Sequence, residues 1–132
     1  MRAAPVLAVG DRSAPRTFGP LTRIDIARFA GAGGDFNPLH LDDAVAQAAG
    51  FPAVIAMGQL QAGIVAGVLS AWVGVERVRR FEVRFSSPFG LGELLEVTGE
   101  VVTVDAGLAS IELVGRVSAR TVIAATASVA VS

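Results

Sequence analysis

Residues 51–75 read FPAVIAMGQLQAGIVAGVLSAWVGV, and none of them carries a charge. Two structures suit so apolar a segment. It is long enough to cross a bilayer, and Gly63 and Gly67 have the GxxxG spacing of packed membrane helices. Alternatively, residues 58–73 form one helix that a β-sheet buries on every side. The two glutamines and the proline inside the segment weigh against the membrane span.

The last third of the chain favours the second structure, because it is patterned as a sheet. Apolar and polar side chains alternate along residues 81–85, 95–101 and 110–116, as in strands with one buried face. Residues 121–131 add a strand of small side chains, and residues 105–107 predict a hairpin turn. A sheet with one apolar face needs an apolar helix to cover it, whereas a single-span membrane protein has no need of four such strands.

The first third predicts one short strand and two helices. We expect a strand at residues 6–9, followed by an ordered loop. Thr22 is a suitable N-cap for a helix over 23–30, with Asp25 as the acidic partner in its first turn and glycines at its end. A second helix is expected over 42–49, where two aspartates complement the helix dipole at its start.

The composition limits the size and the chemistry of the protein. With 132 residues, 52% of them hydrophobic, the chain is expected to form a single domain over 1–132 with its own core. A net charge of −1 gives no electrostatic basis for binding nucleic acid. No secretory signal is expected at the start of the chain, because residues 1–9 lack an adequate apolar stretch. The missing cysteines agree with this, and we expect a cytoplasmic protein.

Missing residue types exclude several kinds of catalysis. The chain has no cysteine or tyrosine, and every basic residue is arginine, so thiolate and Schiff-base chemistry are excluded. His40 is its one histidine, so a histidine-rich metal site cannot form within one chain. Proton transfer near neutral pH must therefore use His40 or a carboxylate.

The densest cluster of reactive groups is at residues 34–40, which read GDFNPLH. Asp35 and His40 are five positions apart, which on a continuous helix would separate them by about 140°. Pro38 forces Asn37 out of the helical region, so the chain must turn between the two groups. A turned segment can aim both side chains into one pocket. Alternatively, Asp35 only caps the turn or the helix that follows, and His40 is a buried histidine with its hydrogen bonds satisfied.

The GDFNPLH segment, with Ala46 six residues later, resembles the hydratase-2 motif of the MaoC-like dehydratases and (R)-specific enoyl-CoA hydratases. The specific part is the Gly-Asp-x-Asn-Pro-x-His core. Three other segments support the resemblance: 9–11 at the exit of the first strand, 55–60 where the family opens its long helix, and 81–88. The resemblance covers nearly the whole chain, from about residue 9 to residue 131.

The resemblance implies an α+β hot-dog fold, in which an antiparallel β-sheet wraps around a long central helix. The charge-free segment is then the wrapped helix and not a membrane span. The family also implies a homodimer, or a heterodimer with a related hot-dog subunit, with the site near the subunit interface.

The implied activity is the reversible hydration of a trans-2-enoyl-CoA or -ACP thioester to the (3R)-3-hydroxyacyl thioester, a hydro-lyase reaction of fatty acid metabolism. By this resemblance Asp35 and His40 form the catalytic dyad, and the backbone amide of Gly58 stabilises the oxyanion. Asn37 and Pro38 hold the turn. No cofactor is implied, and the partner is an acyl-CoA or acyl-carrier-protein substrate.

The sequence departs from the family pattern on both sides of Gly58, which leaves the pocket lining and the substrate preference open. Met57 stands where a histidine is common, and Gln59 where a methionine is common. We expect these two to line the substrate pocket. Two alternatives remain: a hot-dog acyl-thioesterase, or a non-catalytic partner subunit of a heterodimeric dehydratase. Four arginines cluster after the long helix: Arg77, Arg79, Arg80 and Arg84. They either bind the phosphates of coenzyme A or the acidic surface of a carrier protein, or they form a solvated strand face.

Overall fold

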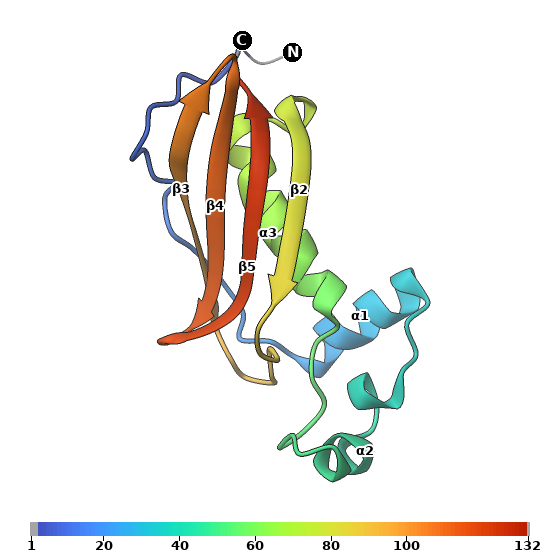
Figure 1. The fold of residues 1–132 in the computed structure, drawn as a ribbon. Helices are drawn as coiled ribbons and strands as arrows, with labels where there is room; N and C mark the ends of the chain where they lie inside the picture. The colour runs from blue at the N-terminus through green and yellow to red at the C-terminus, as the bar shows by residue number, and fades with distance from the viewer. Residues whose placement is uncertain (1–2, 132) are drawn as a thin grey trace.

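The computed structural model describes residues 3–131. Met1, Arg2 and Ser132, which belong to the predicted domain 1–132, lie outside the described residues, as does part of the start considered for a secretory signal. The core of the structure is an antiparallel five-stranded sheet in the order β1-β3-β4-β5-β2, with one long helix, α3, along one face (Figure 1). The strands are β1 (Arg16–Phe18), β2 (Val78–Phe85), β3 (Leu95–Asp105), β4 (Leu108–Val117) and β5 (Arg120–Ala130). This is the predicted α+β architecture, a sheet wrapped around a central helix.

The central helix α3 is Gly58–Val73, as predicted. Val65 and Leu69 are almost fully buried against the sheet. The expectation of burial on every side is wrong, however, because the sheet covers only one side of the helix. A strip of residues four apart faces away from the sheet and is exposed: Gln59, Gly63, Gly67 and Ala71. Within residues 3–131, no helix is both long and apolar enough to cross a membrane.

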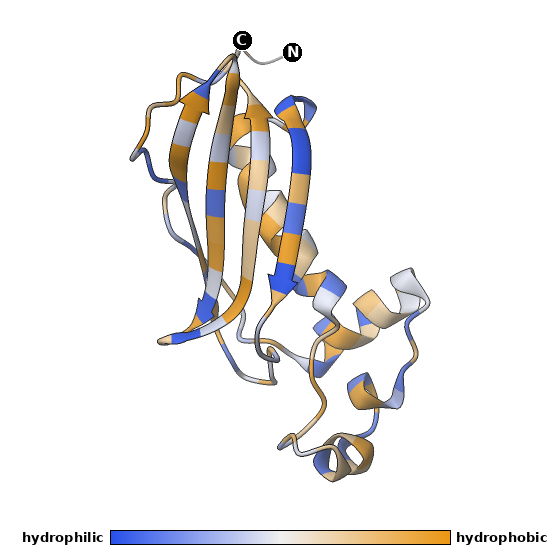
Figure 2. Ribbon diagram, in the orientation of Figure 1, coloured by the Kyte–Doolittle hydropathy of each residue, from blue (hydrophilic) through white to orange (hydrophobic). Residues whose placement is uncertain are grey.

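The long strands have the predicted alternation of buried and exposed side chains, which Figure 2 shows as bands of colour along β3 and β4. On β3, Val97 and Val101 are buried, whereas Glu96 is exposed. The turn between β3 and β4 lies where it was predicted. Ala106 (φ 51°) and Gly107 (φ 79°) take the left-handed conformations of a two-residue hairpin loop.

The predicted strand at residues 6–9 is wrong, and the first strand lies further along, at Arg16–Phe18. The chain turns at Gly10 (φ 92°), because the Asp11 carboxylate accepts a hydrogen bond from the Ala8 N–H at 2.9 Å. Beyond this turn the chain runs along the edge of β3. Regular pairing of β1 with β3 begins only at Arg16, which lies opposite Val97.

Beyond one end of the sheet, residues 23–57 form an overhang that carries two helices, α1 (Arg23–Gly33) and α2 (Asp43–Ala48), and a short 3₁₀ turn, η1 (Pro38–His40) (Figure 1). Thr22 and Asp25 form the predicted capping box, and the hydrogen bonds from Thr22 hold the pKa of Asp25 below its usual range. Helix α1 runs past the predicted residue 30, since only Gly34 (φ 70°) takes the left-handed conformation that ends it. A second 3₁₀ turn, η2 (Val75–Arg77), leads from α3 into β2.

Candidate active site

The chain turns sharply between the end of α1 and His40. Gly34 ends α1, and the Asn37 side chain then accepts a hydrogen bond from the Leu39 N–H at 3.0 Å. Pro38 opens the 3₁₀ turn, because its fixed φ suits the first helical position. The His40 N–H donates to the Asn37 carbonyl at 3.0 Å, which closes the turn.

This turn places the side chains of Asp35 and His40 beside each other. Asp35 Oδ2 lies 3.6 Å from His40 Nε2. The carboxylate is 45% exposed, whereas the imidazole is only 11% exposed. Asp35 Oδ1 also accepts the Asn37 N–H at 3.3 Å, so the carboxylate caps the turn as well as facing the imidazole. At 3.6 Å the two groups are too far apart for a good direct hydrogen bond, but one water molecule can contact both.

A backbone carbonyl fixes the protonation pattern of His40. Its Nδ1 lies 2.8 Å from the carbonyl oxygen of Ile55. A carbonyl oxygen can only accept, so Nδ1 must carry the hydrogen of this bond. In the neutral ring, Nε2 is then left with a free lone pair on the side of Asp35. The imidazole is therefore oriented to accept a proton next to the carboxylate.

Asp43 anchors the segment that holds His40. Its carboxylate accepts two hydrogen bonds from the Arg23 guanidinium, at 3.1 and 2.7 Å, and one from the Val54 N–H at 3.0 Å. Val54 precedes Ile55, whose N–H donates to the Leu39 carbonyl at 3.2 Å. Asp43 thus connects α1 and α2 to the backbone of residues 54–55, and the Ile55 carbonyl orients the imidazole. Sequence reasoning missed this network, because no spacing links Arg23 to a carboxylate twenty residues away.

Asp43→Asn is expected to lower the melting temperature at neutral pH. The melting temperature of the variant should also fall less than that of the wild type as the pH is lowered. The hydrogen bonds from Arg23 and the Val54 N–H hold the pKa of Asp43 below its usual range. A depressed folded-state pKa stabilises the fold above the unfolded pKa of about 4, and this stabilisation is lost as the pH falls through the folded pKa. Thermal melts of both proteins from about pH 7 to about pH 2 measure the difference.

The matched control for this experiment is Asp42→Asn. The Asp42 side chain caps α2 by accepting the Ala44 N–H at 2.9 Å, and asparagine is an equally good N-cap. We therefore expect the control to keep the wild-type melting temperature at neutral pH. An Asp43→Asn protein with the wild-type acid dependence would contradict the anchoring role.

Gly58 begins α3 with a free backbone donor. Met57 precedes it as N-cap but makes no side-chain capping hydrogen bond. Within residues 3–131, no acceptor is found for the Gly58 N–H, as is usual for the first turn of a helix. A Cβ on Gly58 would lie 3.1 Å from the Phe85 ring, so the glycine also permits close packing of the helix on β2.

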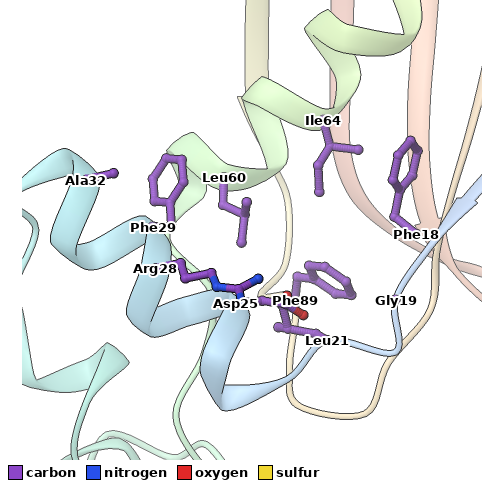
Figure 3. A pocket seen from close by; sticks show the side chains of 10 residues that line it. All are labelled: Phe18, Gly19, Leu21, Asp25, Arg28, Phe29, Ala32, Leu60, Ile64 and Phe89. Atoms are coloured by element: carbon purple, nitrogen blue, oxygen red, sulfur yellow. The ribbon is translucent and has the colours of Figure 1, made fainter.

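An apolar groove of about 450 Å³ lies between α1 and α3. Figure 3 shows Leu60 and Ile64 pointing from α3 toward Phe29 and Phe89. Its lining is completed by six residues: Phe18, Gly19, Leu21, Asp25, Arg28 and Ala32. Ala32 stands three residues before Asp35, so one end of the groove lies on the part of α1 that leads into the dyad.

The predicted pocket residues Met57 and Gln59 do not line this groove. Met57 is buried in the core at 1% exposure, and Gln59 lies on the exposed strip of α3. Sequence reasoning missed Leu60 and Ile64, although their spacing of four residues places them on one face of the helix. Because the helix carries no charge on any face, composition did not distinguish its groove face from its core face.

Comparison with known proteins places these features in context. A family model described as MaoC like domain matches residues 8–123. The curated 3-hydroxyacyl-thioester dehydratase X of Mycobacterium tuberculosis is 38% identical over 68 residues, which are 52% of this chain and 24% of that protein. The match therefore spans about a quarter of the curated relative.

Solved structures give matches over nearly the whole chain. A MaoC-like dehydratase superposes with a TM-score of 0.87 and 34% identity, covering 96% of this chain and 41% of that one. The (R)-hydratase from A. caviae involved in PHA biosynthesis gives 0.84 and 25%, covering 98% of this chain and all of that one. The ChsH1-ChsH2 complex from Mycobacterium tuberculosis gives 0.87 at 23% identity over 96% of this chain and 100% of that one, a likeness of fold alone.

Proposed function

Because this chain belongs to the MaoC-like domain family and has the hot-dog fold, we propose that it catalyses the hydration of trans-2-enoyl thioesters and the reverse dehydration. The product of hydration is the (3R)-3-hydroxyacyl thioester, and the carrier is coenzyme A or an acyl carrier protein. The observation that carries the proposal is the 3.6 Å separation of Asp35 Oδ2 and His40 Nε2, with the imidazole oriented by Ile55. We assign the reaction to the cytoplasm, in keeping with a chain that has no cysteine.

The dyad holds and deprotonates one water molecule. The lone pair on Nε2 and the Asp35 carboxylate each accept one of its hydrogens. As the water oxygen bonds to C3 of the substrate, one O–H bond breaks and the dyad takes the proton. A proton from the dyad goes to C2 on the same face, so the dyad ends with as many protons as it began with. Each well-placed proton-transfer group contributes roughly 10²–10⁴ in rate.

The Gly58 N–H stabilises the charge that develops on the thioester oxygen. When C3 is attacked, the electrons of the double bond move toward this oxygen. A free N–H in the first turn of α3 suits that charge, because its hydrogen bond and the helix dipole act together. Gln59, exposed beside Gly58, is within reach of the thioester arm in this proposal, and buried Met57 acts on the pocket only through packing.

The groove between α1 and α3 receives the acyl chain. Its apolar lining favours the burial of methylene groups, each of which contributes about 0.8 kcal/mol. The end at Ala32 lies on the α1 residues that precede the dyad, so an acyl chain in the groove can keep its C2 and C3 atoms near Asp35.

Ile64→Trp is expected to slow hydration of a long enoyl-CoA about tenfold or more, while crotonyl-CoA is affected little. The larger side chain fills the groove that a long chain needs and that a four-carbon chain does not enter. Ile64→Ala, at the same position, should leave the long substrate active. The ratio of kcat/KM for the two substrates is the measurement, and equal losses for both in Ile64→Trp would remove the groove from the proposal.

The activity itself is tested with the purified chain alone. Loss of the enoyl absorbance of a panel of enoyl-CoA substrates, with chiral analysis of the product, is the expected result. Release of free thiol with no change in enoyl absorbance would identify a thioesterase instead. Inactivity alone, with activity restored by a related hot-dog subunit, would identify a non-catalytic partner. The presence of both Asp35 and His40 argues against that outcome, because a purely structural subunit has no need of them.

A further inference from the structure

The loop between β2 and β3, residues 86–94, is fastened to the start of β5, and the two segments lie side by side (Figure 1). The Ser87 hydroxyl donates to the Thr121 carbonyl at 2.7 Å. Arg120, the first residue of β5, adds two hydrogen bonds to the same part of the loop. Its Nη1 donates to Ser87 Oγ at 2.9 Å and to the Pro88 carbonyl at 2.6 Å.

The other terminal nitrogen of this guanidinium reaches the far end of the loop. Arg120 Nη2 donates to Glu93 Oε2 at 2.5 Å, and Glu93 Oε1 accepts the Gly90 N–H at 2.7 Å. Both side chains are partly buried, at 40% exposure for Arg120 and 31% for Glu93. Salt screens such a pair less than a fully exposed one. Arg120 thus fixes both ends of the loop and Glu93 fixes its middle, and we call these two residues the loop clamp.

The middle of the clamped loop supports the backbone that orients His40. Gly90 forms a β-bridge with Ile55, and the Phe89 carbonyl accepts the Ala56 N–H at 2.9 Å. The Ile55 carbonyl in turn lies 2.8 Å from His40 Nδ1. A continuous series of contacts therefore leads from the loop clamp to the imidazole.

The same loop also contacts the other parts of the proposed site. Phe89 is almost fully buried and lines the apolar groove (Figure 3). Ala56, which Phe89 holds, stands two residues before the proposed oxyanion donor Gly58. The hydrogen bonds of the loop clamp end on the loop itself, so its effect on the dyad passes through backbone.

We propose that Arg120 and Glu93 are positioning residues for the dyad. By holding the loop, they keep the Ile55 carbonyl where it retains the hydrogen of His40 on Nδ1. A neutral imidazole carries its hydrogen on either nitrogen, and the hydrogen bond made by one nitrogen decides the choice. When the carbonyl moves away, part of the hydrogen passes to Nε2, which then cannot accept a proton from water. The effect on rate rests on the proposed function, whereas the state of the ring does not.

The test measures both the ring and the rate in Glu93→Ala and Arg120→Ala. A long-range proton–nitrogen correlation spectrum at about pH 9, where imidazoles are neutral, shows which ring nitrogen carries hydrogen. His40 is the one histidine of the chain, so its signals need no assignment. The wild type should carry the hydrogen on Nδ1, and both variants should show a mixture of the two tautomers. Their kcat with crotonyl-CoA should fall about tenfold or more.

The double variant should lose about as much kcat as either single variant, because the two residues act as one unit. The matched control is Glu100→Ala, which removes the ion pair of Arg12 with Glu100 at 3.4 Å, a pair that joins residue 12 to β3 and not to the loop. The control should keep the wild-type tautomer and kcat. Arg120→Lys retains a cation for Glu93 but loses the forked contact, so its loss should be smaller than that of Arg120→Ala.

Circular dichroism verifies that each variant is folded, and Arg120→Lys decides the test if the alanine variants are not. The wild-type tautomer in the folded clamp variants would overturn the proposal, even with a reduced kcat, because His40 would not be the group affected. An equal change in Glu100→Ala would also overturn it, since the effect would then be general destabilisation. Tautomer changes as expected in a chain that hydrates no enoyl-CoA would refute only the proposed function.

Discussion

Asp35→Asn and His40→Ala are each expected to slow enoyl-thioester hydration at least about a hundredfold while leaving the protein folded. Asparagine keeps the shape of the Asp35 side chain and can still accept the Asn37 N–H, but it cannot take a proton. Alanine removes the Nε2 lone pair that faces the carboxylate. Steady-state kcat/KM with crotonyl-CoA and a longer enoyl-CoA measures the loss, and circular dichroism measures the fold.

The double variant and a control sharpen this test. If Asp35 and His40 hold one water as a unit, the double variant should lose about as much activity as either single variant. Asp42→Asn, which changes a nearby carboxylate to an equally good cap, should keep nearly full activity. Turnover close to wild type in Asp35→Asn or His40→Ala would exclude that residue from the mechanism. Losses that multiply in the double variant would contradict the shared water.

Gly58→Pro is expected to slow the reaction about 10²–10³-fold relative to Gly58→Ala, because it removes the proposed oxyanion donor. Proline is well tolerated at the first position of a helix, where its missing N–H breaks no helical hydrogen bond. The preceding Met57, at φ −68° and ψ 141°, already has the extended conformation that proline demands of its neighbour. The substitution should therefore remove the donor without breaking α3.

Gly58→Ala is the control that makes the comparison specific. Both variants place a Cβ against the Phe85 ring, so both bear the cost of that contact. Only alanine retains the N–H. If the two variants have equal kcat values and equal melting temperatures, Gly58 acts only through close packing, and the oxyanion role is excluded.

Local patterns in the sequence were sufficient to predict most of the elements. The helix α3 lies within the charge-free run, begins at a glycine and ends before another, as predicted, and the capping box at Thr22 followed from spacing. The strand predicted at residues 6–9 failed, because the Asp11 side chain and Gly10 turn the chain there. A short apolar run alone does not distinguish a strand from a segment that one side chain turns.

The sequence by itself determined which groups are available for chemistry. His40 is the one histidine, Asp35 is the carboxylate that a proline-induced turn brings back toward it, and both belong to local structure that spans a few residues. Only the tertiary structure decided how the imidazole is oriented and where an apolar groove forms. The Ile55 carbonyl, the Asp43 anchor and the groove come from segments far apart in the chain, and contacts between such segments depend on packing. Periodicity reports which face of an element is apolar, but not which element will cover that face.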